Sequence, residues 1–243
     1  HVFRRRQRQM CIRDRSYTGN GSAGQAITTG FKPDFILIKS TVGADNWRLY
    51  DTRRGITGGG YLEPNRTDAD DTSNAPNLTM TSTGFTITSG GVTAGNNANG
   101  NLYIYWAIAK NVPSNTTLAN SFKTLTWTGN GSTQSITGAG FRPDLVWIKQ
   151  RNATNHHRLL DSIRGATKIL YSSLNYAEDT ESTGLTAFTS TGFNLGAQQS
   201  VNDNNDTYVA WCWKAGNTWQ SNIDGTIAST VTVSYTHLRA HET

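Results

Sequence analysis

The sequence predicts an all-β protein made of two tandem antiparallel β-sandwich modules. Three observations predict it. Glycine, threonine, serine and asparagine are abundant and only 16% of residues are charged, which favours short strands and tight turns over helices. One set of motifs occurs twice along the chain. Each copy closes with a run in which aromatic and aliphatic residues alternate, as they do in a strand.

The internal repeat is the strongest signal. YTGNGS at Tyr17 returns as WTGNGS at Trp127, and GFKPD at 30–34 returns as GFRPD at 140–144, both at an offset of 110 residues. The offset is 108 for the motif STGF and 105 for the closing motifs YIYW and YVAW. Because each copy is long enough for six or seven short strands, we expect tandem sandwiches rather than a stacked solenoid.

The motif positions set the expected boundaries. We expect a non-native or disordered tail at 1–15, a first β-sandwich repeat at 16–110, a linker at 111–125, a second repeat at 126–215, the start of a truncated further repeat at 216–233, and a non-native tail at 234–243. The terminal strings RQRQMCIRD and SYTHLRAHET resemble translated sequencing-adapter DNA, which is typical of metagenomic fragments.

The positive charge is confined to the first tail. Residues 1–15 hold six arginines and one aspartate, which together equal the whole net charge of +5. The neutral body disfavours nucleic-acid binding, and we expect no membrane insertion because no run approaches 18 apolar residues. A nucleic-acid or membrane arm is the alternative interpretation of the arginine-rich tail.

Short apolar runs locate the central strands. Segments 35–38 and 145–148 are continuous and apolar, which fits strands covered on both faces, and each follows a Pro-Asp pair that stops the preceding element. Segments 48–51 and 158–161 are expected to pair with them as antiparallel hairpins.

The closing strands alternate cleanly. We expect one face of each to be buried inside its own module, namely Ile104, Trp106 and Ile108 in the first copy and Val209, Trp211 and Trp213 in the second. Tyr103, Tyr105 and Ala107 then fall on the opposite face.

The ordered set of motifs resembles a repeat family of unknown function found in tail-fibre and other virion proteins of bacteriophages. Members of that family are similar to the β-sandwich modules of the concanavalin A-like lectins, and the resemblance therefore implies sandwich modules of the jelly-roll or lectin-like kind. The resemblance covers about 16–215, and the first copy departs from the pattern at 58–60 and 90–100. It implies a place on the phage tail or virion surface, an adhesive or structural role, and no established catalytic residue to carry over.

Two pairs of acidic residues recur. Asp34 and Asp144 follow proline at the start of a strand, where a turn-capping role is expected; catalysis would need a second carboxylate at a defined separation. Asp51 and Asp161 each begin a D-x-x-R-G motif, and we expect a buried ion pair with Arg54 and Arg164. A planar clamp for a polar ligand is the alternative.

Two oxygen-rich loops are candidate calcium sites. The residues are Asp68, Asp70 and Asp71, and Asp203, Asn204, Asn205 and Asp206. No EF-hand spacing is present, so we expect ordinary loops and no metal ligand. His156 and His157 correspond to Asn46 and Trp47 in the first copy, which disfavours a metal site shared by both modules.

The remaining candidate residues are expected to have structural roles. Trp47, Trp127 and Trp147 could stack on sugar rings if exposed, but core packing is expected. Cys212 is expected to be a packed residue, whereas Cys11 lies in the tail. The Gly-Asn-Gly loops are expected to be hairpin or bulge turns, and no nucleophile-elbow, zinc-protease or P-loop motif is present.

We therefore predict a non-catalytic structural or adhesion module of a phage virion or tail fibre that contacts host-surface glycans. No enzyme activity, cofactor, catalytic residue or metal ligand is expected, and the ligand-binding residues are left open. The expected partners are other virion or tail subunits and host-surface carbohydrate, with homo-oligomerisation left open. A carbohydrate-active enzyme on a lectin-like sandwich and a calcium-dependent cell-surface adhesin are the alternatives.

Overall fold

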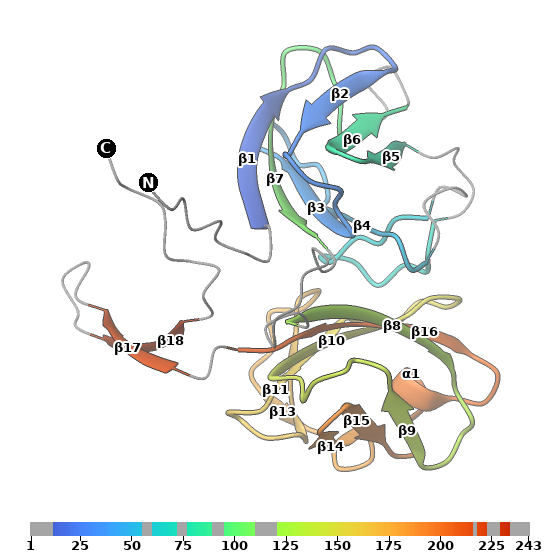
Figure 1. Ribbon diagram of the computed structural model, residues 1–243. Coiled ribbons are helices and arrows are strands. Elements are labelled where there is room, and N and C mark those ends of the chain that lie inside the picture. The colour runs from blue at the N-terminus through green and yellow to red at the C-terminus, as the bar shows by residue number, and fades with distance from the viewer. Residues whose placement is uncertain are drawn as a thin grey trace.

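The computed structural model describes residues 12–54, 60–71, 77–88, 95–109, 121–215, 218–222 and 229–233. They form two lobes, each a sandwich of two antiparallel sheets, and a separate hairpin (Figure 1). The expectation of an all-β fold with tandem sandwich modules is confirmed. Within the described part of the chain, α1 is the one helix. No helix there is long and apolar enough to cross a membrane.

Module 1 is a sandwich of a four-stranded and a three-stranded sheet. The larger sheet has the order β1 (Ile12–Thr18), β7 (Leu102–Ile108), β3 (Phe35–Ser40) and β4 (Arg48–Asp51). The smaller sheet has the order β2 (Gln25–Thr28), β6 (Gly84–Ile87) and β5 (Leu78–Thr81).

Module 2 repeats this topology and extends the larger sheet. Its six strands have the order β13 (Asp179–Thr180), β12 (Lys168–Tyr171), β11 (Arg158–Asp161), β10 (Leu145–Gln150), β16 (Thr207–Trp213) and β8 (Phe122–Thr128). The smaller sheet has the order β14 (Leu185–Thr189), β15 (Gly192–Leu195) and β9 (Gln134–Thr137). The short helix α1 (Gln199–Asn202) precedes β16. In both modules the closing strand is therefore an interior strand, between the opening strand and the first apolar strand.

The strand limits differ from some expected boundaries. β1 begins at Ile12 and β8 at Phe122, so the expected tail and the expected linker each contribute residues to a strand. Within those two segments, residues 1–11 and 111–120 lie outside the described residues, as does the expected tail 234–243. Within 216–233, β17 (Thr218–Asn222) and β18 (Ser229–Val233) pair with each other in antiparallel fashion.

An aromatic stack explains the residue that opens the repeated YTGNGS and WTGNGS motifs. Tyr17 lies opposite Tyr103 across β1 and β7, with ring centroids 5.1 Å apart and ring planes at 14°. Trp127 lies opposite Tyr208 across β8 and β16, with centroids 5.5 Å apart and ring planes at 16°. The opening aromatic of each copy therefore packs on the closing strand inside its own sandwich.

The predicted faces of the closing strands are wrong. In β7, Tyr103, Tyr105 and Ala107 lie in the core of module 1, and in β16 the equivalent Tyr208, Ala210 and Cys212 are buried in module 2. The tryptophan-bearing face points out of its own sandwich: Ile108, Trp106, Val209, Trp211 and Trp213 belong to a third cluster between the modules, and Ile104 is 44% exposed. Because both faces of these strands are apolar, alternation alone does not show which one faces the module core.

A buried asparagine holds the Gly-Asn-Gly turn of each copy. Asn202 Nδ2 donates to the side chain of Asn130 at 3.1 Å, and Asn202 Oδ1 accepts from the Asn130 backbone N–H at 3.1 Å. Asn97 makes the same pair of bonds to Asn20 in module 1. A Cβ built on Gly129 would lie 2.0 Å from the carbonyl oxygen of Asp203, so this turn needs glycine for close approach of two backbones.

We predict that Gly129→Ala lowers the free energy of unfolding by at least about 2 kcal/mol, because the added methyl group meets backbone that the Asn202 bonds hold in place. Chemical denaturation measures the loss. Gly60→Ala is the control, since its Cβ would come no closer than 4.0 Å to a neighbouring atom. Equal losses for the two variants would contradict the close-approach explanation.

Candidate functional site between the modules

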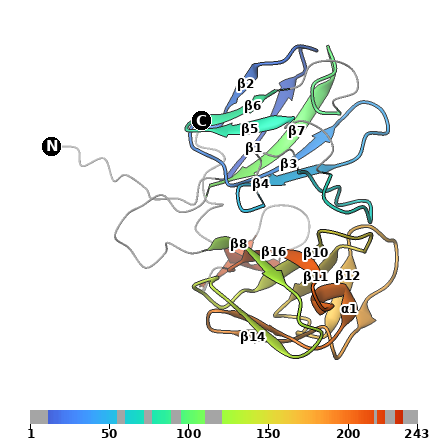
Figure 2. The same ribbon diagram turned by 90° about the vertical axis from the view of Figure 1, so that its right-hand side faces the viewer.

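The two modules meet through an apolar contact, here named the seam. Each module supplies residues from the outer face of its larger sheet, and β3 and β4 of module 1 lie over β8, β16 and β10 of module 2 (Figure 2). The buried members of the seam are Phe35, Leu49, Leu62 and Ile108 from module 1 and Phe122, Trp147, Val209 and Trp211 from module 2. Side chains of this size stabilise by about 1.5–3 kcal/mol each when fully buried, so the seam is a substantial second core.

Phe35 lies at the centre of the seam. Its ring contacts the rings of Phe122, Trp211 and Trp213 across the seam at centroid distances of 5.6, 6.2 and 6.0 Å, all close to edge-on. Trp106 of module 1 stacks on Trp213 at 6.3 Å with ring planes at 8°. These contacts fix how the two lobes are oriented, since aromatic pairs prefer edge-on or offset-stacked geometry.

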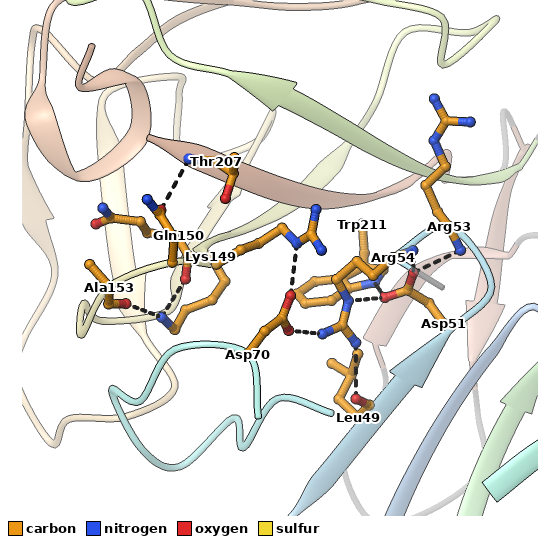
Figure 3. Close-up of polar contacts among 12 residues, drawn as sticks. Leu49, Asp51, Arg53, Arg54, Asp70, Lys149, Gln150, Ala153, Thr207 and Trp211 are labelled. Atoms are coloured by element: carbon orange, nitrogen blue, oxygen red, sulfur yellow. Dashed lines mark hydrogen bonds and ion pairs between the residues drawn. The ribbon is translucent and has the colours of Figure 1, made fainter. Parts of the chain in front are cut away.

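A buried ion pair sits beside these rings (Figure 3). Asp51 Oδ1 accepts the backbone N–H groups of Arg53 and Arg54 at 3.0 and 2.9 Å, and Asp51 Oδ2 accepts Arg54 Nε at 2.5 Å. Trp211 Nε1 of module 2 donates to the same Oδ2 at 3.1 Å. The side chains of Asp51 and Arg54 are 0% and 2% exposed, so the pair is shielded from water.

Asp70 joins the pair to module 2. It accepts Arg54 Nη1 on one oxygen and Arg151 Nε of module 2 at 2.7 Å on the other. Burial lowers the pKa of Arg54, but the carboxylates of Asp51 and Asp70 outweigh it and raise that pKa above its usual value. Two carboxylates therefore share two arginines, and one member of the network comes from the other module.

Backbone contacts continue the seam along the loop 60–71. The Asp70 N–H donates to the Arg151 carbonyl at 2.7 Å, and the Asn155 N–H donates to the Thr67 carbonyl at 2.8 Å. The Ser172 hydroxyl donates to the Pro64 carbonyl at 2.6 Å. This loop of module 1 thus lies along the tip of the β10–β11 hairpin of module 2.

The D-x-x-R motif of module 2 has the same local geometry in a different setting. Asp161 accepts the N–H groups of Ile163 and Arg164 at 3.0 and 2.9 Å and Arg164 Nε at 2.5 Å. Arg164 also pairs with Glu178 at 3.4 Å. The side chains of Asp161 and Arg164 are 25% and 23% exposed, because no module covers them in the described structure. The motif is therefore a self-contained turn whose burial depends on its neighbours.

Lys149 is a buried cation on the module 2 side. Its Nζ donates to the carbonyls of Gln150 at 2.5 Å and Ala153 at 3.2 Å (Figure 3). Burial lowers the pKa of Lys149 to about 8, with Asp70 and Asp68 acting against the shift and Arg158 and Arg54 adding to it.

Next to Lys149, Trp147 Nε1 donates to His157 Nδ1 at 2.9 Å. The His157 proton is therefore on Nε2. Burial lowers the pKa of His157 well below its usual value, and the charges of Lys149 and Arg54 lower it further. The imidazole is accordingly neutral at pH 7, where it acts as a packing and hydrogen-bonding group of the seam.

A cleft of about 400 Å³ opens at one side of the seam. Its charged lining residues are Asp34 and Arg53 of module 1 and Lys123 of module 2. The other lining residues are Thr52, Phe122, Thr124, Leu125, Thr126, Thr137 and Gly138. Charged groups and hydroxyls predominate, which suits a polar, hydroxyl-rich ligand.

Asp34 and Asp144, the residues weighed for catalysis, tie their hairpins together. Asp34 Oδ1 accepts the Thr52 hydroxyl at 2.7 Å, and Asp144 Oδ1 accepts the Ser162 hydroxyl at 2.8 Å. Asp144 Oδ2 also accepts the Ala215 N–H at 2.8 Å. The structure does not bring Asp34 and Asp144 together, because each serves its own module.

The loops weighed for calcium are engaged in pairing. Asp68 pairs with Arg66 at 2.5 Å, and Asp206 accepts the amides of Gln150 and Asn152 at 2.6 and 2.9 Å. Across the residues that the structure describes, no group of three histidine, cysteine, aspartate or glutamate side chains is arranged to hold a metal ion.

Several residues weighed in the sequence are buried or partly buried. Trp127 lies in the module 2 core and Trp147 in the seam, while Trp47 is partly buried in a loop where its N–H donates to Asn65. His156 contacts the Ser173 hydroxyl at 3.0 Å. Cys212 is fully buried, and burial raises the pKa of its thiol.

Sequence reasoning missed the Asp70–Arg151 pair, Lys149 and the cleft. The partners Asp70 and Arg151 are 81 residues apart in different modules, so no local pattern joins them. One signal for Lys149 was available: it directly follows the apolar run 145–148, in the strand expected to be covered on both faces.

The repeated topology and the seam define the class: a pair of tandem β-sandwich modules with one shared interface. A family described as Domain of unknown function (DUF7483) matches the chain twice, over residues 13–112 and 118–237, and the chain belongs to this family. The first match spans module 1, and the second spans module 2 together with the hairpin of β17 and β18. No curated protein and no solved structure matches the chain.

We predict that Asp51→Asn lowers the free energy of unfolding by about 3 kcal/mol, because it leaves buried Arg54 short of one negative charge. The matched variant Asp161→Asn should cost less than about 1 kcal/mol, since water reaches that pair. Denaturant unfolding followed by tryptophan fluorescence compares them. Equal costs would mean that the seam does not shield the first pair.

We predict that Lys149 makes stability rise with pH between about 8 and 10.5. In that window the unfolded chain still holds the lysine proton, whereas the folded protein has lost it. The penalty present below pH 8 is about 3 kcal/mol and is relieved as pH approaches 10.5. Unfolding free energies at several pH values should show this rise in wild type but not in Lys149→Met.

Lys39→Met is the control for this comparison. Lys39 occupies the equivalent position in module 1, also donates Nζ to the next carbonyl, and is only partly buried. Its replacement should leave the rise with pH in place. A Lys149→Met profile that is parallel to wild type would show that Lys149 does not cause the rise.

Proposed function

We propose that the two modules form a non-catalytic structural or adhesion unit of a phage virion or tail fibre, which contacts host-surface glycans and neighbouring tail proteins. The proposal that the unit is non-catalytic rests on the hydrogen bonds that the repeated aspartates make. Asp34, Asp51, Asp144 and Asp161 each accept hydrogen bonds from hydroxyl, backbone or arginine partners within their own hairpin. These hydrogen bonds stabilise the folded hairpins, and this structural role explains why the aspartates recur in both copies.

The cleft at the seam is the part of this surface best suited to a sugar. Arg53 and Lys123 supply charged donors, and the threonines around them supply hydroxyls that both donate and accept. Within the described lining, Asp34 is the one carboxylate. Glycoside hydrolysis usually needs two carboxylates facing each other, so this lining favours binding over the carbohydrate-active enzyme.

The tandem arrangement supports an adhesive role. The seam holds the two modules in one orientation, so a cleft built from both has a defined shape. Weak contacts of this kind gain avidity when several copies are displayed together on one particle.

We predict that the full chain binds host-surface glycans on a glycan array and that Arg53→Ala and Lys123→Ala each weaken binding roughly tenfold or more, as the loss of a charge-assisted hydrogen bond requires. Lys32→Ala is the control, an exposed cation of module 1 that does not line the cleft.

Three outcomes would change the proposal. Binding that all three variants retain would move the glycan site away from the cleft. Release of reducing sugar from a bound glycan would favour the enzyme. Binding that is lost with a calcium chelator and restored by calcium would favour the calcium-dependent adhesin.

A further inference from the structure

The cleft at the seam carries more positive than negative charge. Its charged lining residues are two cations, Arg53 and Lys123, and one carboxylate, Asp34. Arg53 is exposed and Lys123 is partly buried. Asp34 is engaged within its own hairpin, since its Oδ1 accepts the hydroxyl of Thr52 at 2.7 Å. The lining therefore presents an excess of positive charge to a molecule that enters the cleft.

The turn that holds Arg53 leaves its guanidinium group available to a ligand. Only the backbone N–H of Arg53 donates to Asp51, at 3.0 Å, and Figure 3 shows the guanidinium group pointing away from that carboxylate. The charge of Asp51 is balanced by Arg54, with which it forms the buried ion pair of the seam. In the part of the chain that the structure describes, neither Arg53 nor Lys123 belongs to an ion pair.

The turn does not need arginine at this position in order to fold. The motif reads DTRR in module 1 and DSIR in module 2, so that Ile163 stands where module 1 has Arg53. Both residues donate their backbone N–H to the aspartate of the motif at 3.0 Å. Because the same turn forms with either side chain, the arginine at the cleft is free to serve a role other than folding.

The wall of the cleft on the module 2 side is β8, an outer strand of the described six-stranded sheet. Residues 122–126 line the cleft. The Lys214 N–H donates to the Ser121 carbonyl, which shows that odd-numbered residues of β8 bond to β16. Thr124 and Thr126 therefore direct their backbone N–H and C=O groups toward the open edge. With their hydroxyls, these groups supply donors and acceptors for the hydroxyls of a sugar.

Building on the glycan binding proposed for this cleft, we propose that it binds a saccharide that carries negative charge, as a carboxylate or a sulfate. Arg53 pairs with the anionic group, because a guanidinium group donates two parallel hydrogen bonds to such oxygens. Lys123 adds a second positive charge. Thr124 and Thr126 bind the ring hydroxyls through their side chains and backbone. The neutral hydroxyls fix the sugar, and the two cations select an acidic one.

The lining favours a saccharide over an acidic peptide strand added to β8. Strand addition gains its specificity from pockets that receive alternate side chains of the peptide. The apolar lining residues Phe122 and Leu125 are both buried, Phe122 in the seam and Leu125 in the core of module 2. The remaining lining is rich in threonine hydroxyls, which suit the polar face of a sugar.

A panel of matched glycan pairs tests the proposal with the full chain. Each acidic glycan is paired with a neutral counterpart, in which the carboxylate is methyl-esterified or the sulfate is removed. Wild type should bind the acidic member about tenfold more tightly or better, the margin that one charge-assisted hydrogen bond supplies. The preference should shrink as added salt screens the charges. Carboxylated and sulfated pairs show which anionic group the cleft takes.

Arg53→Ile and Lys123→Gln should each bring the ratio of acidic to neutral binding toward one. Arg53→Ile installs the residue that module 2 has at this turn, so the variant is expected to fold, and denaturant unfolding checks this. Asp34→Asn keeps an acceptor for Thr52 and should strengthen binding of the acidic member by a few-fold. Lys32→Gln is the control, because it removes an exposed cation that does not line the cleft and should leave the ratio unchanged.

Different failures identify which proposal is wrong. Acidic and neutral members that bind equally tightly would overturn the selection for negative charge and leave the proposed glycan binding standing. A preference that survives both Arg53→Ile and Lys123→Gln would also overturn it. Binding of no glycan in the panel would overturn both proposals. A short peptide of glutamates that binds as tightly as the acidic glycans would overturn the assignment to a saccharide.

Discussion

The apolar outer face of the larger sheet is the constraint on which the rest of the molecule depends. A two-sheet sandwich hides only the inner face of each sheet, and here the central strands are apolar on both faces. In β16 the inner residues Tyr208, Ala210 and Cys212 fill the core of module 2, while Val209 and Trp211 need a separate cover. Module 1 supplies that cover, so the two modules form one structural unit rather than two independent domains.

The polar network gives this apolar contact its orientation. Hydrophobic burial is not directional, so rings and aliphatic side chains alone permit several rotations of one lobe over the other. Asp51 accepts a hydrogen bond from Trp211 at one point of the seam, and Asp70 accepts one from Arg151 at another. Breaking either bond would leave a shielded charge with fewer partners, and that cost falls on any rotated arrangement. Specific orientation in turn determines the shape of the cleft between the modules.

The sequence revealed features whose cause is local. The repeat, the apolar strands and the turn motifs were predictable because a Gly-Asn-Gly turn or a Pro-Asp strand start depends on neighbouring residues. Which face of β7 lies inside its module could not be predicted, because Tyr103 and Trp106 are both large aromatics. A period of two shows only that their side chains point in opposite directions. The burial of Lys149 and the Asp70–Arg151 pair depend on a second module, and no spacing within one copy encodes it.

The two D-x-x-R motifs show why repetition of a residue is weak evidence for repetition of a role. In both copies the aspartate accepts two backbone N–H groups and the arginine Nε, and the arginine reaches the carbonyl of Leu49 or Leu159. This shared geometry stabilises the turn and is reason enough for the motif to recur. The surroundings then differ: one motif is sealed by Trp211, and the other faces water beside Ile163. What each motif contributes is therefore decided by what packs against it, so one family of modules can use the same turn as an internal joint in one copy and as an exposed surface in the next.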